Sequence, residues 1–72
     1  MTINRETLVT LHAGAGEEEQ AAEWGGTIGE FAFDNWMEES EIEPIIARLA
    51  ETGVTTYGGG AQPLWTIRVA IP

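Results

Sequence analysis

The chain of 72 residues carries twelve acidic side chains against three arginines, with no lysine and no cysteine, and its formal net charge is -9. A chain of this length buries only about 60% of the surface that its unfolded form exposes, which argues against an enzyme with a deep cleft. The shortage of basic groups argues against direct binding of nucleic acid or of an anionic membrane, and the missing thiols exclude a disulfide scaffold. Because 43% of the residues are hydrophobic, we expect a single folded domain over residues 1–72.

The N-terminal part of the chain contains two short candidate elements. Residues 7–11 combine β-forming side chains with Asn4 as a candidate helix cap, so both a strand and a helix stay open. Residues 17–24 are rich in helix-forming side chains and are followed by Gly25, which predicts a short helix that ends there.

Residues 27–35 carry a helix signature after the glycine pair. Thr27 and Glu30 have the spacing of a capping box, in which each side chain binds the other residue's backbone amide. A helix from this point places Ile28, Phe31 and Ala32 on one face. A strand is the alternative, because aromatic residues favour sheets and Phe31 alternates with a second phenylalanine.

The strongest helix signal lies in residues 41–51, where apolar side chains recur at the spacing of one helix face. Ser40 with Glu43 predicts a capping box, and Pro44 is tolerated if it lies in the first turn. Gly53 is well placed to end the helix in a left-handed conformation. The apolar stripe consists of Ile42, Ile45, Ile46 and Leu49.

The acid-free C-terminal segment predicts a β-hairpin. Residues 54–57 and 64–71 are rich in β-formers and are joined by a glycine-rich loop at residues 58–63. The sequence therefore predicts an α+β fold, a small single domain with short helices packed on a C-terminal antiparallel β-hairpin. A core of this size leaves a homodimer possible. The residues on the hairpin's apolar face are Trp65, Ile67, Val69 and Ile71.

No pattern in the sequence indicates catalysis, a metal or another cofactor. His12 is the only imidazole, and Ser40, the only serine, is explained as a helix cap rather than as a nucleophile. A zinc site lacks a second histidine, and the acidic runs lack the spacing of a calcium loop. The glycines at 58–60 are not followed by the lysine of a phosphate-binding loop. We expect no enzymatic activity and no cofactor.

Ten carboxylates and no basic residue lie between Glu17 and Glu43. Helix faces exposed to solvent usually interleave basic residues, and crowded carboxylates repel and raise one another's pKa. The stretch therefore indicates either solubility or a negatively charged recognition surface. Trp24 and Trp36 lie within it, either as core residues or as exposed anchors for a basic partner. The candidate partner-binding acids are Glu17, Glu18, Glu19, Glu23, Glu38, Glu39, Glu41 and Glu43.

In size, charge and distribution of acids, the chain resembles the small acidic inhibitors that phages and mobile elements direct against host nucleic-acid-handling proteins, such as anti-CRISPR proteins and DNA mimics. The resemblance implies a cytoplasmic inhibitor whose carboxylates occupy a basic surface where phosphates normally bind. The alternative is a small regulatory adaptor that binds a protein through apolar and aromatic side chains, with the acids serving solubility. Only the first of these functions predicts binding that weakens steeply with salt.

Overall fold

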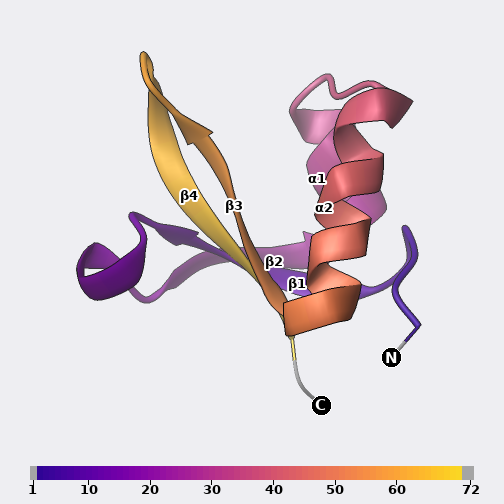
Figure 1. Cartoon of the computed structure of the whole chain (residues 1–72), viewed down its shortest axis with the longest axis horizontal. Helices are drawn as coiled ribbons and strands as arrows, with labels where there is room; N and C mark the ends of the chain where they lie inside the picture. The colour runs from indigo at the N-terminus through magenta and orange to yellow at the C-terminus, as the bar shows by residue number, and fades with distance from the viewer. Residues whose placement is uncertain (1, 71–72) are drawn as a thin grey trace.

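The computed structural model describes residues 2–70, and there two helices lie against one face of a four-stranded antiparallel sheet (Figure 1). The strand order is β2-β1-β4-β3, so that β1 and β4 form the centre of the sheet. This arrangement confirms the predicted α+β fold and adds two N-terminal strands to the predicted hairpin. The elements in chain order are β1 (Leu8–Ala13), the 3-10 helix η1 (Gly16–Glu18), β2 (Ala22–Thr27), α1 (Ile28–Asp34), α2 (Glu39–Thr52), β3 (Val54–Gly59) and β4 (Gln62–Val69).

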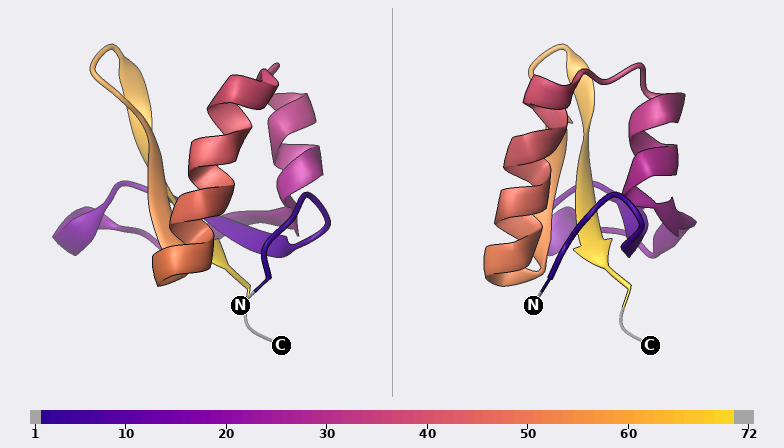
Figure 2. Two further views of the ribbon diagram at one scale, coloured as in Figure 1. Left: turned by 45° about the vertical axis from the view of Figure 1, so that its right-hand side comes forward. Right: turned by 90° about the vertical axis from the view of Figure 1, so that its right-hand side faces the viewer.

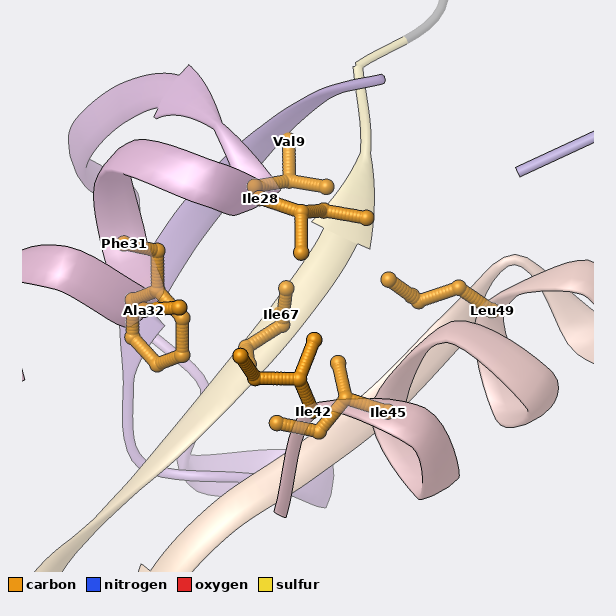
Figure 3. Close-up of a cluster of buried hydrophobic side chains, with 8 residues drawn as sticks. All are labelled: Val9, Ile28, Phe31, Ala32, Ile42, Ile45, Leu49 and Ile67. Atoms are coloured by element: carbon orange, nitrogen blue, oxygen red, sulfur yellow. The ribbon is translucent and has the colours of Figure 1, made fainter. Parts of the chain in front are cut away.

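The hydrophobic core lies between the helices and the sheet (Figure 3). Strand residues contribute to it alternately, because successive side chains of a strand point to opposite faces. Val9 of β1 and Ile67 of β4 are therefore buried, whereas their neighbours Leu8 and Arg68 are exposed. The buried hydrophobic residues are Val9, Ile28, Phe31, Ala32, Ile42, Ile45, Leu49 and Ile67.

Helix α2 confirms the strongest sequence signal. Three residues of the predicted stripe are buried, and the fourth, Ile46, packs partly buried against the core. The helix ends as predicted at Gly53, which adopts a left-handed φ of 80° and donates its amide to the carbonyl of Leu49. No helix of the described residues, α2 included, is long and apolar enough to cross a membrane.

The start of α2 differs from the prediction. The cap residue is Glu38, without a side-chain hydrogen bond, and Ser40 lies inside the first turn, so the predicted Ser40 cap is wrong. The helix begins earlier because acidic side chains in the first turn are stabilised by the helix dipole. Pro44 consequently lies in the second turn, where it cannot donate to the carbonyl of Ser40. Both residues are exposed, so water can bind that carbonyl.

The predicted helix over residues 17–24 is wrong. The chain forms η1 and then the edge strand β2, which pairs with β1 from Leu8↔Thr27 to His12↔Ala22. Pairing with β1 satisfies backbone groups and outweighs the helix propensity of the segment. The strand requires glycine at position 26, because the ring of Trp24 covers this position. A Cβ there would lie 2.7 Å from that ring.

Two segments left open by the sequence are now assigned. Residues 7–11 fall largely within strand β1, and residues 28–34 form helix α1. The capping box that favoured this helix is present, since Thr27 Oγ1 accepts from the amide of Glu30 and Glu30 Oε1 accepts from the amide of Thr27. A local hydrogen-bonding signal thus decided correctly between helix and strand.

The C-terminal hairpin is confirmed with a shorter turn than predicted. Strand β3 extends to Gly59 and β4 begins at Gln62, so pairing continues into the glycine-rich segment. On the predicted apolar face Ile67 is buried and both Trp65 and Val69 are half-buried, while Ile71 lies outside the described residues.

We expect Leu49→Asp to unfold the protein, because Leu49 is 0% exposed and an unpaired carboxylate would enter the core. Ala47→Asp is the matched control, since it places the same side chain on the exposed side of α2. The control should lower the free energy of unfolding by only about 1 kcal/mol. Urea unfolding followed by circular dichroism measures both, and cooperative unfolding of Leu49→Asp near the wild-type midpoint would contradict the assigned core.

Candidate protein-binding site

Helix α1 ends in a Schellman motif with a tryptophan at its left-handed position. The amide of Met37 donates to the carbonyl of Ala32 at 3.0 Å, and the amide of Trp36 donates to that of Phe33 at 3.3 Å. The residue after the C-cap of this motif is usually glycine. Trp36 occupies it with a φ of 54°, and it is the only non-glycine residue with positive φ among residues 2–70. A side chain there raises the backbone energy by about 1–2 kcal/mol.

The ring of Trp36 gains no burial that would offset this strain. Trp36 is 92% exposed and Phe33 is 80% exposed, so two large aromatic side chains stand in solvent at the α1–α2 connection. Exposed apolar surface marks interaction sites where it forms a patch rather than single scattered residues. Tryptophan is also among the residues most enriched in the energetic centres of protein interfaces.

Carboxylates flank the two rings. Asp34 lies between them in sequence, and Glu38 caps the following helix; both are exposed. We call Phe33, Asp34, Trp36 and Glu38 the aromatic corner. Further acids follow in the first turns of α2, where the exposed Glu41 and Glu43 have no arginine within ion-pair distance among the described residues and Glu39 pairs with Arg5. The corner therefore joins apolar anchors to negative charge.

The structure does not bring the two predicted acidic clusters together. Glu17 and Glu18 lie exposed on η1 and Glu23 lies exposed at the start of β2. The η1 segment lies at the far left and the α1–α2 connection at the upper right of Figure 1 and of the left view of Figure 2. The continuous acidic run of the sequence becomes two separate acidic regions, because β2 carries the chain across the sheet between them.

Glu19 is engaged within the chain rather than free for a partner. Its carboxylate accepts hydrogen bonds from Nε and Nη2 of Arg68 at 2.7 and 2.8 Å and lies 3.5 Å from Nδ1 of His12. The hydrogen bonds from Arg68, with the charges of Arg68 and His12, lower the pKa of Glu19 below its ordinary value. This direction is opposite to the one that crowding of acids predicts. The pair ties the η1 segment across the sheet to β4.

His12 has a structural explanation in the same segment. Its Nδ1 lies 2.9 Å from the carbonyl oxygen of Gln20, to which only a protonated nitrogen can donate, and its Nε2 lies 2.8 Å from Oγ1 of Thr10. Both ring nitrogens are therefore occupied by backbone and hydroxyl partners. Within residues 2–70, no group of three or more histidine or acidic side chains is placed to hold a metal ion.

Trp24 is a wall of a hollow rather than an exposed anchor. Its ring is half-buried, with its centroid 6.4 Å from that of Phe31. The two rings, together with Leu11, Asp34 and Asn35, line a surface hollow of about 270 Å³. Phe33, Asp34 and Asn35 were not among the site residues predicted from the sequence. Phe33 does not belong to the predicted apolar face of α1. An aromatic residue outside that face could have indicated a ring exposed to solvent.

Trp36→Gly should leave the free energy of unfolding unchanged or raise it by up to about 1 kcal/mol, because glycine adopts the left-handed conformation without strain. Gly53→Ala is the matched control, since it introduces a Cβ at the equivalent position of α2 with nothing within 4 Å to clash. This variant should lose about 1 kcal/mol. Thermal and urea unfolding measure both, and a large loss in Trp36→Gly would show that the ring supports the fold.

The Glu19–Arg68 pair should make stability depend on acid pH. Because the pKa of Glu19 is lowered in the folded state, its contribution is fully present above the ordinary carboxyl value of 4.5 and is lost as pH falls through the lowered value. The stability difference between wild type and Glu19→Gln should therefore shrink between about pH 6 and about pH 3. Glu18→Gln, which removes a neighbouring acid, is the control in urea unfolding at each pH. Equal pH profiles for the two variants would contradict the role of Arg68.

Comparison with known proteins identifies no relative of this chain. No protein-family model matches the chain, and neither the curated proteins nor the solved structures contain a match. The functional assignment therefore depends on the geometry of the aromatic corner, the hollow and the charges around them.

Proposed function

We propose that this protein is a binding protein that covers a basic surface of another protein through its aromatic corner. The observation that carries the proposal is Trp36, which keeps a strained backbone conformation while its ring lies almost wholly in solvent. Residues with strained backbone conformations cluster at functional sites, such as ligand clamps and switch regions. In the bound state, the rings of Trp36 and Phe33 enter an apolar recess of the partner.

The charge of the protein selects the chemistry of that partner. Of the twelve carboxylates, Glu19 and Glu39 form ion pairs with arginine, and the other ten have no arginine within ion-pair distance among residues 2–70. Carboxylates next to the aromatic corner attract lysine and arginine, and a net charge of -9 speeds encounter with a positive surface. A basic recess with an apolar floor is the complementary site.

Proteins that handle nucleic acids present such surfaces, because phosphate binding requires clustered basic groups. A bound acidic protein occupies those groups and excludes the nucleic acid. We therefore propose a phage-type inhibitor, anti-CRISPR-like in its charge mimicry, that acts in the cytoplasm of a host cell. The separation of the acids into two regions favours a mimic that uses one of them, at the aromatic corner, over one that uses the whole acidic run.

A regulatory adaptor is the second candidate, and the same exposed rings favour it. An adaptor would bind its partner mainly by burying Trp36 and Phe33, with the carboxylates keeping the protein in solution. Its affinity would depend little on salt. The inhibitor depends on ion pairs, which salt screens.

The test is capture of partners from bacterial lysate on the immobilised protein at low and high ionic strength, followed by binding measurements with each purified partner. We expect partners that bind DNA or RNA and release it when the protein is added. We expect the Trp36→Gly variant to fold. It should weaken binding of the partner about 30-fold or more, as loss of an interface anchor does.

Matched charge variants identify the acidic region that is used. Replacing Glu38, Glu41 and Glu43 with Gln should reduce the association rate more strongly than replacing Glu17, Glu18 and Glu23 with Gln, which makes the same change in net charge. Both sets spare Glu19 and Glu39, so the ion pairs of the fold remain. If the partners keep their nucleic acid, or if binding is insensitive to salt, the protein is the regulatory adaptor and not the inhibitor. Full binding by Trp36→Gly would overturn both.

A further inference from the structure

We propose that the hollow between β2 and α1 is a binding pocket for one cationic side chain, that of an arginine or lysine on the partner. The pocket is lined by Leu11, Trp24, Phe31, Asp34 and Asn35. This proposal rests on the proposed function, because the cation comes from the partner. It adds which chemical group the partner supplies.

The size and walls of the pocket fit a single side chain. Its volume of about 270 Å³ lies below the range of roughly 300–1,000 Å³ that is typical of sites for small molecules. Two of its walls are the rings of Trp24 and Phe31, and the face of a tryptophan is the best aromatic partner for a cation. The pocket is preformed, because Phe31 is 3% exposed and is held by the ring of Tyr57, at a centroid distance of 5.4 Å and an angle of 86°.

The two polar lining residues carry acceptor oxygens, as binding of a cation requires. Asp34 supplies a carboxylate. Asn35 donates from its Nδ2 to the carbonyl of Phe31 at 2.8 Å, and this bond fixes the amide so that Oδ1 remains as an acceptor. A guanidinium carries five N–H donors in a planar arrangement and can use both acceptors while it stacks on a ring.

A second carboxylate strengthens the negative potential at Trp24. The ring of Trp24 and Oε1 of Glu30 both lie within about 3 Å of the position that a Cβ on Gly26 would take, at 2.7 and 3.1 Å. Glu30 is held there by the capping box, through the amide of Thr27 at 2.9 Å. Two acids, one turn apart on α1, thus lie near Trp24.

No basic group of the described chain fills the pocket. Arg5 and Arg68 are bound to Glu39 and Glu19, and Arg48 lies exposed on α2 and is not a lining residue. Asp34 belongs both to the pocket and to the aromatic corner, so one partner surface can place a cation in the pocket while it receives the ring of Trp36. The partner therefore carries an arginine or lysine beside its apolar recess.

The experiment titrates the whole protein with N-acetyl-arginine amide and, separately, with N-acetyl-citrulline amide, which has a similar shape and no charge. The indole N–H resonance of Trp24 reports binding by nuclear magnetic resonance, and those of Trp36 and Trp65 serve as internal references. We expect a saturable shift confined to Trp24, with binding of citrulline about fivefold weaker or more.

Asp34→Asn should weaken arginine binding about threefold. It should not unfold the protein, because Asp34 is exposed at the C-terminal end of α1, where a negative charge is unfavourable. Glu51→Gln, at the other end of α2, is the control and should leave binding unchanged (Figure 1). No shift of Trp24, or equal shifts with arginine and citrulline, would overturn the pocket. The titration contains no partner protein and tests the pocket alone. The binding measurement with Trp36→Gly tests the proposed function, so a failure of one proposal can be told from a failure of the other.

Discussion

The pairing of β1 with both β2 and β4 is the interaction on which the rest of the structure depends. It joins the N-terminal residues to the C-terminal hairpin, and the intervening helices must then cover one face of the resulting sheet. It also fixes where α1 begins, because the amides of Ile28 and Gly29 donate to the carbonyls of Thr7 and Arg5, just before β1. The entry of α1 is thereby set by the sheet, and its end presents the aromatic corner.

Local signals in the sequence predicted the elements whose stability is local. The apolar spacing of α2, the capping box of α1 and the β-rich hairpin each identified an element correctly. The Ser40 cap was a local error, whereas the missed strand depends on distant residues. Strand β2 exists because β1 pairs with it, and nothing within residues 17–24 shows that partner. The site was predictable to the same degree: Trp36 was a candidate anchor, but the Schellman geometry that exposes it depends on where α1 ends.

The fold also explains how the protein tolerates its charge. Eleven of the twelve acidic residues are exposed, and they are spread over the segment before β1, η1, β2 and both helices instead of following one helix face. Charges farther apart than the screening length, about 8 Å at physiological salt, repel weakly. The remaining acid, Glu19, is held by Arg68 and contributes favourably to the fold. Self-repulsion is thus limited by position, and the acids at the aromatic corner stay free to bind.

In the proposed complex, the aromatic corner and the pocket contribute two different kinds of interaction. Long-range attraction to a net charge of -9 is strong but indifferent to the detailed arrangement of basic groups, so it speeds encounter without selecting one partner. Selection requires short-range contacts, and the exposed ring of Trp36 and the preformed hollow beside Trp24 provide complementary ones: a ring that enters the partner and a cavity that receives a side chain from it. Such a pair fixes the orientation of the two proteins, because both contacts form together in only one arrangement. The proposed interface can therefore be specific although it is small.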